Sequence, residues 1–198
     1  MKKTIIVIAL ASICLSCSNT STKSTDSADS VKTSIIDTAA ANIAYGSINF
    51  GISEKEFKKL LPNTFNTVGS YEYAFYPTFK DDKLYLLEIA SVSKPATEIE
   101  SSLEPLAENL LKVLTNKYGP ATESRAKLDF FDFKPGTIQW QHYWKIHTKT
   151  LKIGISENST GGTYRTLLWI YDEPTFDKIK KENLASDEAQ RLKDSEKF

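Results

Sequence analysis

The positions of its two cysteines constrain the fold of this chain more than any other feature. Cys14 and Cys17 both lie near the N-terminus of the 198 residues, and the sequence after Cys17 contains no cysteine. The folded part must therefore form without a disulfide, on a hydrophobic core alone. Apolar residues make up 40% of the chain, which is enough for such a core.

The N-terminal segment has the parts of a secretion signal. Lys2 and Lys3 precede an apolar run from Thr4 to Ile13. That run is too short to span a bilayer, which needs about 20 residues, but it has the length of a signal-peptide core. The sequence Leu15-Ser16-Cys17 then resembles a lipobox, where bacterial lipoproteins are acylated on the cysteine and cleaved before it. The resemblance implies a signal peptide at residues 1–16 and lipidation of Cys17; the alternative is an ordinary secretory signal with incidental cysteines.

The resemblance to a lipoprotein also implies a location. Several acyl chains on one cysteine hold a protein in a membrane effectively permanently. The residues after Cys17 contain neither an early Asp of the kind that retains lipoproteins in the inner membrane nor an acidic run of the kind that exports them. We therefore expect a lipid-anchored protein of the cell envelope, at the outer membrane and facing the periplasm.

Residues 17–41 are predicted to form the lipidated cysteine and a flexible tether. The segment is rich in Ser, Thr and Asp, and after Cys17 it holds no aromatic residue, so it buries too little apolar surface to offset the entropy of ordering. Ser27, Ser30 and Thr38 each follow an Asp and precede an apolar residue. This pattern resembles the O-glycosylation motif of envelope proteins in one large Gram-negative phylum. A merely solvated linker is the alternative.

The rest of the chain is predicted to be one α+β globular domain, residues 42–185, followed by a charged tail at residues 186–198 that frays. Without Lys2 and Lys3, 23 basic residues face 25 acidic ones. This balance does not favour nucleic acid as a partner.

Helix and strand signals occur in two successive passes, each a helix followed by antiparallel strands. In the first pass Ser53 and Glu56 form a capping box, and Pro62 ends the helix. In the second, Pro105 either kinks the helix or marks a new start, and Gly119-Pro120 ends it. The two helices are predicted at about 53–61 and 97–118, and a last one at about 173–192. The strands are predicted at about 47–52, 71–76, 83–92, 126–133, 137–147, 150–157 and 164–171, with a turn at Asp81-Asp82.

The two passes form units joined in one sheet-and-helix domain. The segments Phe50 to Leu61 (strand, Phe-Gly-Ile-Ser, helix) and Tyr118 to Trp140 (helix end, Tyr-Gly-Pro, strands with Trp) resemble in outline two kinds of tandem α-β envelope module. These are the β-lactamase-inhibitor-protein type and the SmpA/OmlA type of outer-membrane assembly module. The resemblance implies binding of other proteins without catalysis.

Signals for catalysis are weak. His142 and His147 lie five residues apart on one predicted strand, and so on opposite faces, which argues against a shared metal. The chain has neither a Gly-rich phosphate loop nor a Gly-x-Ser-x-Gly motif, and we expect no cofactor. The alternative function is a periplasmic, hydrolase-like enzyme that uses Glu88, or Asp172 with Glu173.

Aromatic residues give the best indication of a binding surface. Trp140 and Trp144 are expected on one face of their strand with Tyr143 on the other, while Trp169 and Tyr171 share a face of the last strand. Trp and Tyr suit a surface that binds an envelope protein or a glycan. We therefore predict a non-catalytic binding or scaffolding domain.

Overall fold

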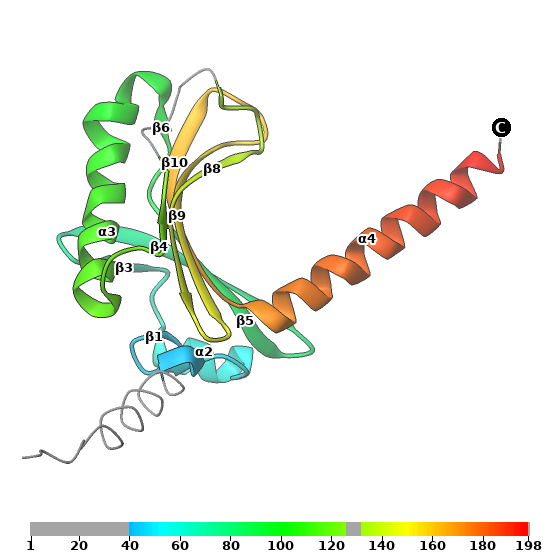
Figure 1. Ribbon diagram of the computed structural model, residues 1–198, viewed down its shortest axis with the longest axis horizontal. Coiled ribbons are helices and arrows are strands. Elements are labelled where there is room, and N and C mark those ends of the chain that lie inside the picture. The colour runs from blue at the N-terminus through cyan, green and yellow to red at the C-terminus, as the bar shows by residue number, and fades with distance from the viewer. Residues whose placement is uncertain (1–39, 126–131, 198) are drawn as a thin grey trace, which may run out of the picture.

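The computed structural model describes residues 40–125 and 132–197 and has the α+β architecture expected from the sequence (Figure 1). Cys17, Ser27, Ser30, Thr38 and most of the strand predicted at 126–133 lie outside the described residues. One main antiparallel sheet has the strand order β3-β4-β5-β10-β9-β8-β7, with β6 paired to β10, and a separate small sheet pairs β1 with β2. The strands are β1 (Ile43–Tyr45), β2 (Ile48–Asn49), β3 (Phe65–Val68), β4 (Tyr71–Lys80), β5 (Lys83–Ala90), β6 (Lys94–Pro95), β7 (Glu123–Ser124), β8 (Ile138–Ile146), β9 (Lys149–Glu157) and β10 (Thr163–Asp172).

The pair β5–β10 lies inside the main sheet and joins the two halves of the chain. Strands β3, β4 and β5 come from the first half, and β7 to β10 come from the second. Residues 86–90 of β5 pair in register with residues 167–171 of β10. The strands of both predicted passes therefore lie in one continuous sheet.

Helix α3 (Glu104–Tyr118) covers one face of this sheet (Figure 1). Its buried residues Ala107, Leu110 and Leu114 belong to the main core cluster, which includes side chains from β4, β5, β8, β9 and β10. Buried Tyr73 of β4 donates a hydrogen bond to the Leu106 carbonyl at 2.8 Å, and burial raises its pKa to about 12. This apolar layer between α3 and the sheet is the core of the domain.

The start of α3 decides between the two alternatives for Pro105. A 3-10 turn (Ala96–Glu98) and a π-helical turn (Ile99–Leu103) precede α3, and Pro105 lies in its first turn. Proline is tolerated there because the first N–H groups of a helix have no intrahelical partner. Pro105 thus marks a new helix start. Gly119 follows the helix with a φ of 80°, as the predicted helix end requires.

The first-pass signals are confirmed in their local detail. Ser53 and Glu56 form the capping box of α2 (Glu54–Leu60). Asp81 and Asp82 both have positive φ in the two-residue turn between β4 and β5, as a tight hairpin needs. The strand expected at 47–52 is shorter, because only Ile48–Asn49 pairs, and β3 was not expected at all.

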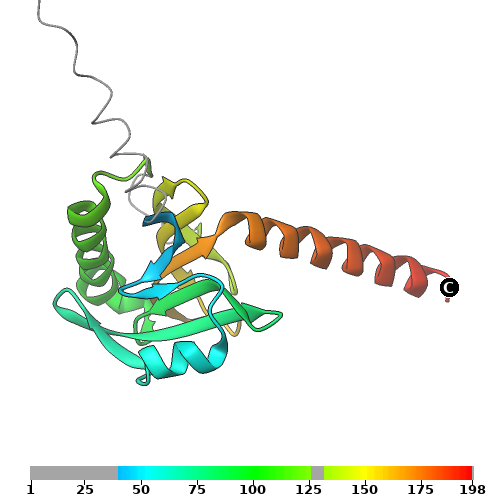
Figure 2. The same ribbon diagram turned by 90° about the horizontal axis from the view of Figure 1, so that it is seen from below.

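Helix α4 (Glu173–Ser195) projects from the domain instead of covering it (Figures 1 and 2). Asp172 caps its start through a hydrogen bond from the Thr175 backbone N–H, and none of its residues is buried. With 23 residues it is longer than α3 and continues past the predicted end near Leu192. Fraying of residues 186–198 stays a prediction. No helix in the described ranges is both long and apolar enough to cross a membrane.

A fully buried lysine fixes residues 40–43 against the sheet. The Lys149 ammonium donates hydrogen bonds to the carbonyls of Ala40 and Ile43 (3.1 Å for Ile43) and to the Tyr118 hydroxyl at 3.2 Å. These three acceptors match its three N–H groups. Burial lowers the pKa of Lys149, yet the saturated ammonium ties residues 40–43 to β9 and to the end of α3.

Lys149→Met should lower the free energy of unfolding by about 2 kcal/mol, because it leaves two partly buried carbonyls without a donor while sparing the packing of the side-chain stem. Denaturant unfolding measures the change. Lys112→Met, at an exposed position of α3, is the control and should change stability by less than about 0.5 kcal/mol. Equal stability of the two variants would contradict this role of Lys149.

Candidate binding face

A β-bulge decides which side chains of β8 reach the open side of the sheet. Trp140 pairs with Gly154 and His142 pairs with Ile153, so Gln141 is an extra residue in β8. A bulge of this kind shifts the in-out alternation of side chains by one residue. Trp140 and Tyr143 therefore point to the same side, whereas strict alternation predicts opposite sides.

Four of the five predicted surface residues lie together on the face opposite α3. These are Trp140, Tyr143, Trp169 and Tyr171, as the strand register shows. Trp144 is a correction: it is 2% exposed within the main core cluster, and its indole N–H donates to the Gly119 carbonyl at 3.0 Å. The bulge at Gln141 is the reason, because it separates Trp144 from Trp140. We call the four residues and Lys152 the aromatic face.

Lys152 lies at the centre of the aromatic face. Its ammonium is 5.8 Å from the ring centroid of Trp140, 5.5 Å from that of Tyr143 and 5.6 Å from that of Tyr171. Cations within about 6 Å of a ring face are attracted to it. Lys152 thus holds three rings around one charge.

The rings also contact one another and the start of α4. Trp140 and Trp169 form an edge-to-face pair with centroids 5.2 Å apart. Phe176 of α4 lies 4.4 Å from the ring of Tyr171 and 6.0 Å from that of Trp169. Tyr171 is 4% exposed, whereas both tryptophans are half-buried. Tyr171 therefore supports the surface from below, and the tryptophans offer contact area.

Glu88 orients Trp169 and has no free oxygen for chemistry. One carboxylate oxygen accepts the Trp169 indole N–H at 2.8 Å, and the other pairs with the Arg165 guanidinium at 3.1 Å. The Glu88 side chain is only 17% exposed. Both oxygens of the Glu88 carboxylate thus have structural partners, and the bond to Trp169 fixes the orientation of its indole ring.

Aromatic and charged residues alternate in one row across six strands. From β4 to β7, each residue pairs with the next in register, in the order Tyr76, Glu88, Trp169, Lys152, Tyr143, Glu123. Neighbouring strands are about 4.8 Å apart, so the row is about 24 Å long and an aromatic residue recurs about every 10 Å. Hollows of about 290 and 430 Å³ flank the tryptophan pair, lined by residues that include Tyr143 and Lys152 in the first and Arg165 and Trp169 in the second.

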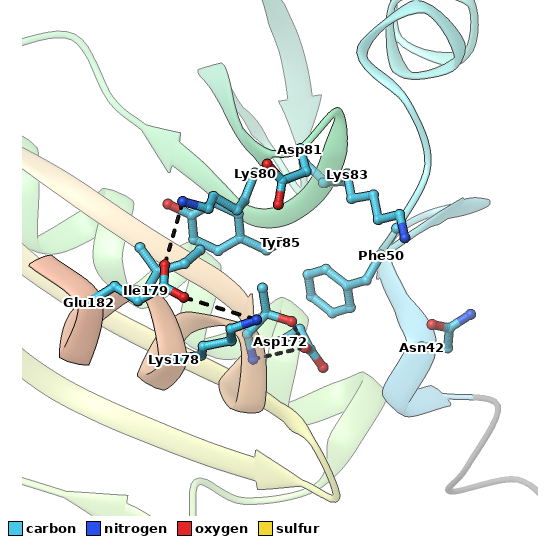
Figure 3. Close-up of a pocket in the computed structure, with 13 residues that line it drawn as sticks. Asn42, Phe50, Lys80, Asp81, Lys83, Tyr85, Asp172, Lys178, Ile179 and Glu182 are labelled. Carbon is cyan, nitrogen blue, oxygen red and sulfur yellow. Dashed lines mark hydrogen bonds and ion pairs between the residues drawn. The ribbon is translucent and has the colours of Figure 1, made fainter.

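Another hollow, of about 640 Å³, lies between the β4–β5 hairpin, the segment around Phe50 and the first turns of α4 (Figure 3). Its charged lining is mixed in sign: Lys80, Lys83 and Lys178 against Asp81, Asp172 and Glu182. Glu182 pairs with Lys80 at 3.5 Å and Lys178 at 4.0 Å. This mutual compensation leaves no net charge in the hollow to select an ionic ligand.

The other acids suggested for catalysis also have structural partners. Asp172 accepts hydrogen bonds from the backbone N–H and the hydroxyl of Thr175, and Glu173 forms an ion pair with Lys145. His142 bonds to the Ser124 hydroxyl at 3.0 Å, and burial lowers its pKa. Within the described parts of the chain, no group of three or more His, Cys, Asp or Glu side chains is placed to hold a metal ion.

The contributions of Lys152, Arg165 and Phe176 to this face, and the structural role of Glu88, are not evident from the sequence alone. Lys152 stands between the apolar Leu151 and Ile153, and this alternation signals an outward-facing position. Its neighbours on β8 and β10 depend on strand register, which the sequence does not show.

Comparison with known proteins found no match to this chain among family models, curated protein sequences or solved structures. The interpretation of the aromatic face therefore depends on its own geometry.

Gly154→Ala should destabilise the fold by about 2–3 kcal/mol, because the new methyl group would lie 2.3 Å from the Gln139 carbonyl oxygen, on backbone that carries the β8 bulge. Gly162→Ala is the control: it also adds a methyl group, at a positive φ but with no atom within 4 Å, and should lose only about 1 kcal/mol. Urea unfolding of both variants measures the difference. A Gly154→Ala domain as stable as the wild type would contradict the close approach.

Proposed function

We propose that this chain is a lipid-anchored protein of the bacterial cell envelope whose domain binds an elongated partner, a glycan or an envelope protein, through the aromatic face. The row of alternating aromatic and charged residues across six strands supports this proposal most directly. A ligand that lies across the strands would meet a ring about every 10 Å, with a charged group between successive rings. The flat face of a sugar or of an apolar side chain stacks on the rings, and polar groups bond to the charges.

The aromatic face is preorganised, which favours binding. Glu88 fixes the indole of Trp169, Lys152 holds three rings, and Phe176 packs against Tyr171 and Trp169. Side chains already held in place lose little entropy when a ligand binds. Helix α3 covers only the other side of the sheet (Figure 1), so this face stays accessible beyond the start of α4.

The anchor and tether follow from the lipobox at Cys17 and the composition of residues 17–41. A flexible chain of about 23 residues has a mean reach of roughly 25–30 Å. The domain would sample a shell of that depth beside the membrane, with the outer membrane and the periplasm as the proposed location. O-glycosylation at Ser27, Ser30 and Thr38 is part of this proposal, because glycans there would keep the tether extended and soluble.

We also infer that the domain consists of two related units, in line with the outline resemblance to tandem envelope modules. In each half a helix precedes a set of antiparallel strands. The strand order from the centre outwards is β5, β4, β3 on one side and β10, β9, β8 on the other. A hydrolase that acts through Glu88, Asp172 or Glu173 has less support, because each of these carboxylates already has a partner.

Acylation of Cys17 can be tested by metabolic labelling. Cells grown with labelled palmitate should incorporate the label into the wild-type chain and into Cys14→Ser but not into Cys17→Ser, since only the lipobox cysteine is modified. Gel fluorography and the mass of the mature N-terminal peptide measure this. Label on Cys14, or on neither residue, would refute the proposed anchor.

Photo-crosslinking in living cells tests the aromatic face. Benzoylphenylalanine at position 143 should form an adduct with the partner, whether protein or glycan, while the same probe at exposed position 112 on α3 should not. Adding Trp140→Ala to the position-143 probe should lower the adduct yield by about tenfold, as for a hot-spot aromatic. A folded Trp140→Ala protein that retains the full yield would contradict binding at this face, and so would equal adducts from positions 143 and 112.

A further inference from the structure

An apolar cavity of about 270 Å³ lies on the α3 side of the sheet, away from the aromatic face. Helix α3, strands β3, β5, β9 and β10, and the β1 segment form its walls. The lining residues are Ala44, Tyr45, Gly46, Val68, Ile89, Leu110, Val113, Leu114, Lys117, Tyr118, Leu151, Leu168 and Ile170. Most of them belong to the main hydrophobic core.

The lining favours a hydrocarbon ligand over water. Among the described residues that line it, Lys117 is the only charged one, and the only other polar side-chain groups are the hydroxyls of Tyr45 and Tyr118. A buried water needs two to four polar partners, and a cavity of about 150 Å³ lined by Leu, Ile and Phe stays dry and takes up benzene. The body of this cavity provides no such partners for water.

Positive charge gathers at one end of the cavity, where α3 finishes. The Lys117 ammonium is 5.1 Å from the ring centroid of Tyr118, and the Lys149 ammonium is 4.6 Å from the same ring. Within residues 40–125 and 132–197, neither lysine forms an ion pair with a carboxylate. Lys149 donates its three N–H groups to protein oxygens. Lys117 is exposed, and no carboxylate of residues 40–125 and 132–197 pairs with it, so its ammonium group can meet a ligand.

We infer that this cavity binds a free aliphatic carboxylic acid, with the hydrocarbon chain between α3 and the sheet and the carboxylate at Lys117. An apolar interior with a cation at its opening complements a long-chain carboxylate, because the chain packs on the apolar walls and the carboxylate pairs with the ammonium group. The inference does not depend on the aromatic face, because the two sites lie on opposite sides of the sheet.

Calorimetric titration of the mature chain, residues 17–198, with the series octanoate, decanoate and dodecanoate tests the hydrocarbon part. The chain carries Cys17→Ser, so that no covalent acyl group competes. Affinity should rise about fourfold for each added methylene until the cavity is full, then level off. Dodecanol and a lysophospholipid distinguish the carboxylate from other head groups and should bind about fivefold more weakly than dodecanoate. Absence of binding by the whole series would overturn the inference.

Paired variants locate the site. Lys117→Met should weaken dodecanoate about fivefold and leave dodecanol unchanged, while Lys112→Met, on the same helix outside the cavity, should change neither. Ala44→Leu should weaken both ligands because it fills the cavity, and Ala185→Leu on exposed α4 should weaken neither. Circular dichroism checks that each variant folds. If Ala44→Leu unfolds, the comparison of Lys117→Met with Lys112→Met decides whether dodecanoate binds in this cavity. Unchanged dodecanoate affinity in Lys117→Met would refute the assigned orientation.

Discussion

The antiparallel pairing of β5 with β10 is the contact on which the rest of this structure depends. It joins strands from the two halves of the chain at five successive positions, from Leu167 with Ala90 to Tyr171 with Leu86. Because side chains alternate along both strands, this pairing places one set of side chains in the core under α3 and the other set on the opposite face of the sheet. Leu87, Ile89, Leu168 and Ile170 form the floor of the core under α3, and Glu88 and Trp169 meet on the opposite side.

The aromatic face depends on one further backbone detail, the bulge at Gln141 opposite Gly154 and Ile153. A regular β8 would place either Trp140 or Tyr143 under α3. The bulge brings both rings to Lys152 and leaves Trp144 in the core, where its indole N–H bonds to the end of α3 at Gly119. Gly154 is required there because the backbone of β8 approaches too closely for a methyl group. Gln141 and Gly154 thus determine both which ring of β8 packs in the core and which rings lie on the aromatic face.

Three lysines have different roles because their surroundings differ. Lys149 is buried and saturated by protein oxygens, so it holds residues 40–43 against β9 and the end of α3. Lys152, three residues after Lys149 and so on the opposite side of the sheet, is surrounded by rings and organises the aromatic face. Lys117 ends α3 in an exposed position beside an apolar cavity, where its charge is available to a ligand. The three lysines thus lie in different parts of one sheet-and-helix layer, and the proposed partner and ligand would meet different ones.

The sequence by itself determined the elements whose signals are local. The capping box at Ser53, the Asp81-Asp82 turn and the helix end at Gly119 depend on interactions within about four residues, so they can be recognised without knowledge of the fold. Only the tertiary structure decided the bulge that moves Trp144 into the core, the row of residues across six strands, the partners of Lys149 and Glu88, and the projection of α4. These features depend on which strand lies beside which and in what register. That pairing joins residues up to 85 positions apart, as in Leu86 with Tyr171 (171 minus 86). It follows from burial of the whole apolar face under α3, which no local segment of the sequence contains.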